Sequence, residues 1–269
     1  MGFTVERSGQ TFRIYADGRL FTSCVYEPEY VRPFMGPVFA SDFSQFTRFA
    51  PNHPEHPHQR SVFVGIGDVN GVDCWNERGE NKGRMTLDSV LDVREGDTAC
   101  VSVRLVWSAI DDGRKLVDEV RTIRFEKKAD CIAVYHTSEF LASYGDVTFG
   151  QTKEAGPLGI RVTDELRADR GGTFTNSEGG VNEEACWGKT AKWCNYYGAA
   201  GGRTIGIACF DRRSNTRYPS AWHIRNYGLM APNNLLFKGE EHIRQGESLR
   251  YDYLICFWEG AFDPTRYEE

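Results

Sequence analysis

The feature that most constrains the fold is a two-residue alternation of apolar and polar side chains, which recurs along this 269-residue chain. Residues 101–107, Val-Ser-Val-Arg-Leu-Val-Trp, are an example. Successive side chains of a strand point to opposite faces, so this alternation is typical of a strand with one buried face and one wet face. The best strand candidates are residues 11–15, 61–66, 99–107, 116–125, 131–140, 204–210 and 251–258.

Turn signals rich in glycine and aspartate separate these segments and suit hairpins between antiparallel strands. They lie at residues 16–18, 95–97, 111–113 and 198–202. No window of about twelve residues has helical periodicity, so we expect few helices, all short. No linker rich in proline or charge divides the chain. We therefore predict an all-β fold, an antiparallel β-sandwich, with residues 1–269 as a single domain.

Charge and hydropathy argue against several classes of partner. The net charge is −6, the pI is about 5.6 and the basic residues are dispersed, which argues against binding to nucleic acid or an anionic membrane. The longest apolar stretches are far shorter than the roughly 18 residues of a membrane span. We see no secretory signal, and the eight scattered cysteines indicate buried, reduced thiols. We expect a cytoplasmic protein.

The first polar cluster is Asn-His-Pro-Glu-His-Pro-His-Gln-Arg at residues 52–60, with three of the six histidines. In an extended stretch His56 and His58 point to the same side, where they can bind one metal ion or share a proton transfer. The alternative is a surface loop stiffened by prolines, and the spacing matches no named metal motif.

The second cluster, residues 67–76, follows the predicted strand that ends at residue 66. Asn70 and the glycine after it favour a tight turn. Asp73 and Trp75 then alternate on the outgoing strand. A carboxylate and an indole that face one cavity suit sugar recognition, whereas a purely structural hairpin is the alternative.

The third cluster centres on Glu154, next to glycines and a lysine. Burial would raise the pKa of Glu154 and make it the leading carboxylate for general acid or base work. A simple salt bridge is the alternative. Further along, Glu178, Trp187 and Lys189 add an acid, an indole and an ammonium group.

The fourth cluster is the sequence Trp-His-Ile-Arg-Asn-Tyr. In an extended segment His223, Arg225 and Tyr227 share one face, and Trp222 and Asn226 share the other. The polar, cationic face suits an anionic or hydroxyl-rich ligand. The alternative is a strand face that is merely solvated.

Other familiar chemistries have no sequence support. The chain has no phosphate-binding Gly-x-x-x-x-Gly-Lys motif, no dinucleotide glycine fingerprint and no Gly-x-Ser-x-Gly elbow. Nucleotide binding and serine-hydrolase chemistry are therefore not predicted.

At these clusters the chain resembles a bacterial family of unknown function labelled PmoA-like. The matching pieces are residues 32–34, 56–60, 67–75, 149–154, 176–179, 187–189, 222–228 and 246–249. That family has His-Pro-His-His-Arg-Gly at the first motif, whereas this chain has Gln59 and Ser61 in place of the second paired His and the Gly. The methane oxidation that the label suggests does not fit a chain without a membrane span.

The strand-rich length is also similar to the galactose-mutarotase-like supersandwich. By analogy, this resemblance implies sugar chemistry, since members of that fold include epimerases, lyases and hydrolases that transfer protons through His and Glu or Asp.

Our lead hypothesis is an intracellular carbohydrate-active enzyme of hydrolase, lyase or epimerase type that uses His/Glu acid–base chemistry. The predicted catalytic residues are His58, Glu154 and His223. The predicted substrate-binding residues are Arg60, Asn70, Asp73, Trp75, Glu178, Trp187, Lys189, Trp222, Arg225 and Asn226. Two alternatives remain: a divalent metal bound by His56, His58, Glu154 and His223, and a non-catalytic carbohydrate-binding protein.

Overall fold

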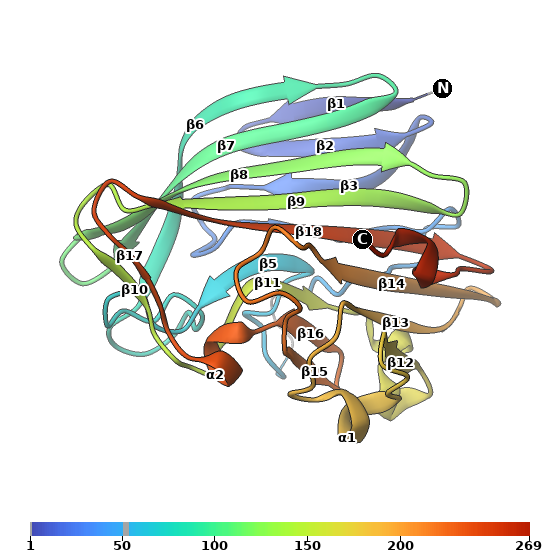
Figure 1. Cartoon of the computed structure of the whole chain (residues 1–269). Coiled ribbons are helices and arrows are strands. Elements are labelled where there is room, and N and C mark those ends of the chain that lie inside the picture. The colour runs from blue at the N-terminus through green and yellow to red at the C-terminus, as the bar shows by residue number, and fades with distance from the viewer. Residues whose placement is uncertain (1, 51–53) are drawn as a thin grey trace.

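The computed structural model describes residues 2–50 and 54–269. The framework consists of two eight-stranded sheets that pack face to face, and every strand pair in them is antiparallel (Figure 1). The predicted all-β antiparallel sandwich is therefore confirmed.

The first sheet contains the amino-terminal strands and ends with strands from the second half of the chain. Its order is β1 (Phe3–Ser8), β2 (Thr11–Ala16), β3 (Arg19–Val25), β4 (Phe34–Met35), β5 (Val62–Ile66), β11 (Ala155–Arg161), β16 (Leu229–Pro232) and β15 (Trp222–Arg225).

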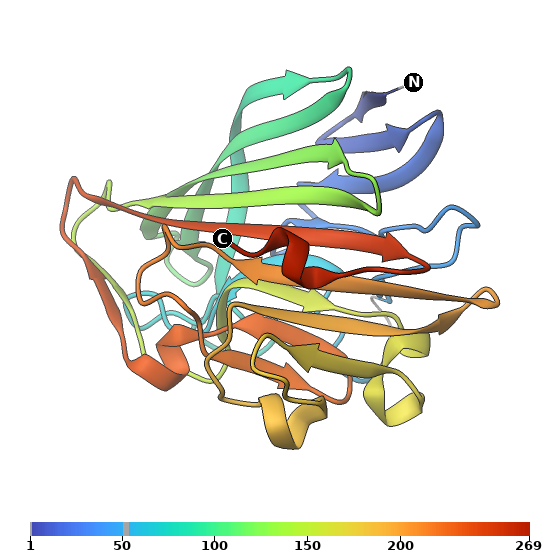
Figure 2. The same ribbon diagram turned by 45° about the vertical axis from the view of Figure 1, so that its right-hand side comes forward.

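The second sheet holds the longest strands. Its order is β12 (Thr173–Asn176), β13 (Trp193–Ala200), β14 (Arg203–Asp211), β18 (Ser248–Glu259), β9 (Cys131–Leu141), β8 (Lys115–Lys127), β7 (Thr98–Ala109) and β6 (Gly83–Arg94). In Figure 2 these long strands lie in front of β5, β11 and β16.

The remaining elements are short. They are the paired strands β10 (Val147–Phe149) and β17 (Glu241–Ile243), the helices α1 (Asn182–Cys186) and α2 (Asn234–Lys238), and the 3₁₀ helices η1 (Asp164–Leu166), η2 (Ala168–Arg170) and η3 (Pro264–Tyr267). The prediction of few, short helices is confirmed for the described residues. Among these residues, no helix has the length and apolar character needed to cross a membrane.

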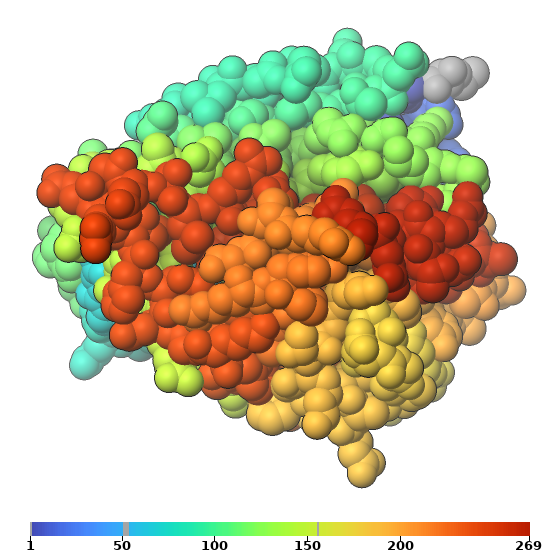
Figure 3. Space-filling model, in the orientation of Figure 1, coloured from blue at the N-terminus to red at the C-terminus, as the bar shows by residue number. Residues whose placement is uncertain are grey.

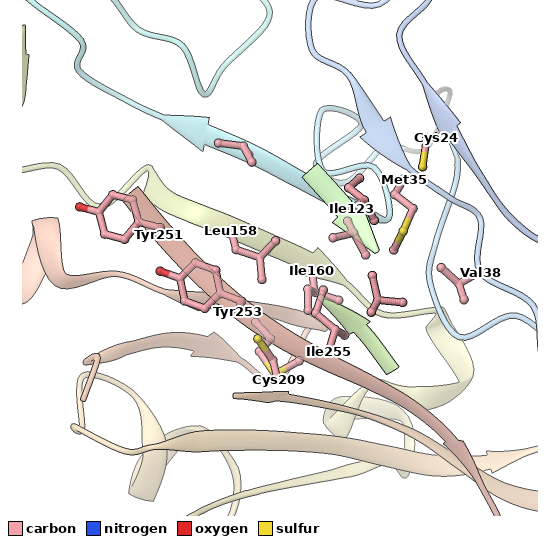
Figure 4. Packing of buried hydrophobic residues seen from close by; sticks show 14 of the residues in the cluster. Cys24, Met35, Val38, Ile123, Leu158, Ile160, Cys209, Tyr251, Tyr253 and Ile255 are labelled. Carbon is pink, nitrogen blue, oxygen red and sulfur yellow. The ribbon is translucent and has the colours of Figure 1, made fainter. Parts of the chain in front are cut away.

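The hydrophobic core lies between the two sheets. Alternate residues of β18 point into it, and Tyr251, Tyr253 and Ile255 lie opposite Leu158 and Ile160 of β11 (Figure 4). Because the inward side chains of both sheets are apolar, burial of this layer stabilises the sandwich and fixes which face of each strand points outward.

Each segment predicted from alternation overlaps a strand, namely β2, β5, β7, β8, β9, β14 or β18. The long strand β6 was missed. From Thr86 onward none of its side chains is buried, because β6 forms the edge of its sheet. An exposed edge strand has no clear apolar face, so its alternation is weak.

The outer face of the second sheet is partly covered by the end of the chain. Phe262 and Tyr267 pack against a buried cluster that includes Cys131, Cys256 and Trp258. The dark red residues of Figure 3 show this segment lying on the surface of the sandwich. All eight cysteines are buried and none forms a disulfide, as the sequence predicted.

Candidate functional site

The predicted residues His56, His58, His223 and Arg225 lie on the outer face of the first sheet, over β5, β11, β16 and β15. On β15, Trp222 and Ile224 point into the core, so His223 and Arg225 point outward. The predicted alternation therefore holds for residues 222–225, whereas residues 226–228 form a turn rather than the predicted extended segment. On β5, Phe63 belongs to a separate apolar cluster on this outer face.

One row of side chains crosses this face. Gly159 of β11 pairs with Phe63 of β5 on one side. On the other side it lies opposite Ala231 of β16, one residue beyond the stretch in which β11 and β16 pair. Ala231 in turn pairs with His223. The Phe63 ring fills the space over Gly159, whereas Ala231 carries only a methyl group, so the row is lowest at Ala231, next to His223.

Glycines on this face let large groups lie directly on the backbone. A Cβ on Gly159 would come within 2.7 Å of the Phe63 ring, and a Cβ on Gly65 would come within 2.7 Å of Arg32 Nη1. The Arg32 guanidinium also lies over the ring of Phe63, at 5.2 Å, and near that of Trp75, at 6.0 Å. An aromatic and cationic layer therefore covers the centre of the sheet.

Glu77 is the buried carboxylate of this layer. It receives two hydrogen bonds from the guanidinium of Arg60 and lies 3.4 Å from Arg32 Nη2. Burial works to raise the pKa of Glu77, but the bonds from Arg60 and the charge of Arg32 outweigh it and lower the pKa below its ordinary value. Glu77 therefore stays ionised and holds two arginines in place.

Buried arginines also hold the loop that carries His56 and His58. Arg48 Nη2 donates to the backbone carbonyls of Glu55 and His56, at 2.8 and 3.1 Å, and Arg32 Nη2 donates to that of His58 at 2.7 Å. Charge-assisted hydrogen bonds from guanidinium groups to backbone carbonyls hold a loop firmly in one conformation. The imidazoles are therefore presented on a preorganised support.

The predicted extended conformation of this loop is wrong. His56 has a φ of 50°, and the chain turns before residue 60. The two rings nevertheless lie close, 5.8 Å apart and nearly perpendicular. His53, the third histidine of the cluster, lies outside the described residues.

Tyr227 joins this loop to β15. Its ring stacks on His56 at 4.9 Å, and the guanidinium groups of Arg161 and Arg225 lie 4.6 and 5.4 Å from its centre. Arg161 is fully buried and donates to Gln59 at 2.9 Å. The first and fourth sequence clusters therefore meet, although more than 150 residues separate them.

His223 has a defined partner. The indole Nε1 of Trp187 donates to His223 Nδ1 at 3.1 Å. Trp187 itself precedes β15 in the sequence and leaves 41% of its surface exposed, whereas His223 is only 2% exposed. The indole thus covers the imidazole from the solvent side.

All three described imidazoles of this face have lowered pKa values. Burial, with the charges of Arg32 and His56, lowers the pKa of His58 to about 4. Burial and the charges of Arg225 and Lys153 lower the pKa of His223 to about 4 as well. Burial and Arg161 lower the pKa of His56. The rings are therefore neutral near pH 7.

Glu154 does not have the burial on which its predicted role was based. Its side chain is 41% exposed, and its nearest described cation is Lys153 Nζ at 3.9 Å. The neighbouring Lys153 is the more informative residue, because its positive charge lowers the pKa of both His56 and His223. The residue of this loop whose charge acts on the histidines is therefore Lys153 rather than the predicted Glu154.

Two further predicted residues serve the loop that joins β5 to β6. Asn70 bonds through its side chain to the backbone of Asp146 and Thr148. Asp73 accepts from the backbone of Trp75 and from Lys82 Nζ, at 2.8 and 2.7 Å. Neither side chain is available to a ligand, so the structural alternative for this cluster describes it better.

Two of the predicted indoles are not exposed platforms. Trp222 is fully buried and donates to the carbonyl of Ala191 at 2.8 Å, so its side chain cannot contact a substrate as predicted. Trp75 is 3% exposed and packs beneath His58, with ring centres 6.4 Å apart. Only Trp187 presents an open indole face.

The remaining predicted residues lie around α1 and β15. Asn226 and Arg225 both contact Glu183 of α1, with Arg225 Nε 2.7 Å from its carboxylate. Glu178 is exposed in the turn after β12 and accepts from Ser177. Lys189 is exposed, and its backbone bonds to that of Trp222. These residues border the site without lining its centre.

The predicted metal centre is not formed. Within residues 2–50 and 54–269, no three His, Cys, Asp or Glu side chains are placed to hold a metal ion. His56, His58, Glu154 and His223 therefore do not make a four-ligand set, and Nδ1 of His223 is already bonded to Trp187.

Sequence reasoning named Tyr227 together with His223 and Arg225 but missed Glu77, Lys153 and Arg161 as residues of this face. Lys153 and Glu77 lie directly beside sequence clusters, so their positions could have identified them. Arg161 stands apart from every cluster, and only the packing of distant segments reveals it.

The family model that matches the sequence spans residues 11–269 and describes a family of unknown function, DUF6807. The chain belongs to the DUF6807 family. This membership confirms a family of unknown function, whereas nothing in the match concerns the PmoA-like label. Among curated proteins, none matches the sequence.

Solved structures with a similar arrangement of strands include two proteins of comparable length. The Slr1438 protein of Synechocystis sp. PCC 6803 is 9% identical with a TM-score of 0.40, covering 97% of this DUF6807 chain and 96% of its own. A galactose mutarotase-like protein of Lactobacillus casei ATCC 334 is 8% identical with a TM-score of 0.40, covering 95% and 100%.

A variant of a glycoside hydrolase family 97 enzyme from Pseudoalteromonas sp. strain K8 is also similar. It is 8% identical with a TM-score of 0.39, covering 96% of this chain and 34% of that one. At such scores the likeness carries no inference about the site of this family member or its reaction.

Proposed function

We propose that the outer face over β5, β11, β16 and β15 is the active site of a carbohydrate-processing enzyme that moves protons with neutral imidazoles. One observation carries this proposal. His56, His58 and His223, from segments far apart in the sequence, converge on one face with lowered pKa values. Perturbed titratable groups that gather at one place are a mark of functional sites.

His58 is the proposed general base. A neutral imidazole has a free lone pair, and among the described residues no group bonds to either ring nitrogen of His58. It would take a proton from a sugar hydroxyl or an acidic C–H, so that the imidazole becomes protonated and the substrate oxygen or carbon gains the electron pair. Lys153, whose charge is only weakly paired, would stabilise the negative charge that develops.

Aromatic rings supply the proposed sugar-binding surface. Trp187 has an exposed ring, and Tyr227 is half-buried between His56 and two guanidinium groups. The C–H faces of a sugar ring pack on such aromatics, while hydroxyl groups bond to the polar side chains around them. Ring-opening epimerisation and elimination both begin with the proton removal assigned to His58.

The test is a sugar panel followed by a turnover assay. Thermal shift against mono-, oligo- and keto-sugars identifies a ligand, since binding to the native state raises its melting temperature. Proton NMR of the mixture then detects hydrolysis, elimination or epimerisation. We expect His58→Gln to lower kcat by at least about 100-fold while binding persists.

His242→Gln is the matched control, because His242 of β17 is exposed and pairs with the neighbouring Glu240. It should retain full turnover. Undiminished turnover in His58→Gln would refute the assignment of the base. A sugar that binds the wild-type protein without any conversion would instead indicate a non-catalytic binding protein.

A further inference from the structure

The bond between Trp187 and His223 determines which nitrogen of the imidazole carries the proton. An indole N–H can only donate a hydrogen bond. His223 Nδ1, which accepts it at 3.1 Å, must therefore hold a lone pair. In the neutral ring the proton then resides on Nε2. Trp187 is a positioning residue that makes His223 a hydrogen-bond donor at Nε2.

The Nε2 atom has no hydrogen-bond partner among the described residues. It belongs to a ring that points outward from β15 and lies across from the small side chain of Ala231. Buried polar groups are normally hydrogen-bonded, so a donor on a largely buried ring that lacks a protein partner is suited to a ligand acceptor.

The charges around His223 are positive. Arg225 is paired with Glu183 at 2.7 Å, which offsets its charge. Among the described residues, the one carboxylate within ion-pair distance of Lys153 is Glu154, at 3.9 Å, and the lysine side chain is 55% exposed. The backbone carbonyl of Lys153 accepts from Asn233, which lies two residues beyond the Ala231 that pairs with His223, and the charge of Lys153 acts on the imidazole. Lys153 is thus a weakly paired cation beside an open N–H donor.

We propose that His223 Nε2–H and the Lys153 ammonium form an oxyanion subsite, so that the ligand is a sugar bearing a negatively charged substituent. A carboxylate, as in a uronic acid, and a sulfate or phosphate ester share the required chemistry. This inference rests on the proposed function, since it names the class of sugar that the same site takes. The exposed Trp187 ring beside the subsite would pack against the sugar ring.

The first experiment measures the tautomer directly on the full chain without any ligand. Nitrogen-15 NMR of the histidine side chains should show His223 with an unprotonated Nδ1 and a protonated Nε2 at pH 7. Trp187→Phe removes the donor and should give a mixture of tautomers. A protonated Nδ1 in the wild-type protein would overturn the inference.

The second experiment compares anionic and neutral ligands by calorimetry. The probes are glucuronate and galacturonate, glucose 6-sulfate and glucose 6-phosphate, and the parent neutral sugars. We expect an anionic sugar to bind at least about tenfold more tightly than its neutral parent, and Lys153→Met to remove that difference. Lys128→Met is the control, because Lys128 pairs with Glu126 in the turn between β8 and β9.

The outcomes separate this inference from the proposed function. Equal binding of charged and neutral sugars would overturn the subsite and leave the sugar site intact. If no sugar binds but sodium sulfate shifts the His223 Nε2 resonance in a Lys153-dependent way, the subsite stands and the sugar function fails. No response to any sugar or to sulfate would overturn both. Preference for uronates over the esters would identify a carboxylate as the substituent.

Discussion

The lowered pKa of His223 makes a quantitative prediction about stability. In the unfolded chain a histidine has a pKa near 6.5, whereas in the folded protein burial and the charges of Arg225 and Lys153 lower the pKa of His223 to about 4. Between these values the unfolded state binds more protons than the native state. The stability that His223 contributes is therefore complete above pH 6.5 and is lost as the pH falls toward 4.

The magnitude follows from linkage. One pKa unit corresponds to about 1.36 kcal/mol, so the full loss below pH 4 is about 3 kcal/mol, and about 2 kcal/mol of it occurs between pH 7 and pH 5. The 2% exposure of His223 leaves little solvent screening to reduce this figure. At pH 5 most carboxylates remain ionised, which limits their contribution.

The assay is urea unfolding of the wild-type protein and of His223→Gln at pH 7 and pH 5. Glutamine can accept the hydrogen bond from Trp187 but cannot titrate, and the other histidines are the same in both proteins. The free energy of unfolding should fall by about 2 kcal/mol more in the wild type than in the variant. Equal losses in the two proteins would refute the assignment of a buried, neutral His223.

Further predictions concern the layer beneath the imidazoles. Glu77→Gln leaves Arg32 and Arg60 without their shared carboxylate. It should therefore lower the free energy of unfolding, measured by urea titration, by about 3 to 5 kcal/mol. The control Glu80→Gln, at an exposed position, should change this free energy by less than about 0.5 kcal/mol. Gly65→Ala places a methyl group 2.7 Å from Arg32 Nη1 and should cost about 1 to 3 kcal/mol, and a neutral effect in the same assay would show that the guanidinium moves freely. All eight thiols should react with a thiol reagent only after unfolding, and fast labelling of several thiols in the native protein would contradict their burial.

The fold class and the direction of several site residues were determined by the sequence alone. Period-two alternation predicted the main strands of the sandwich, because strand geometry sends alternate side chains to opposite faces whatever lies around them. The same rule correctly placed His223 and Arg225 on one face of their strand and Trp222 on the other.

Only the tertiary structure decided which polar groups are free to act. Asp73 and Trp75 looked like ligand contacts, yet the carboxylate holds its own loop together and the indole is buried. Trp187 and Trp222 are both indoles in polar clusters, but one is exposed and the other is part of the core. Burial depends on what packs across a side chain, and those neighbours come from distant segments.

The site itself is also formed only by the tertiary structure. Glu77 lies outside every sequence cluster, and Arg161 supports Tyr227 from a strand whose apolar and glycine residues gave no sign of it. Lys153 acts on histidines about 70 and 100 residues away along the chain. Electrostatic influence and hydrogen-bond partnership depend on distance in space, so local patterns could name the histidines, Arg225 and Trp187 but not which of these groups act on one another.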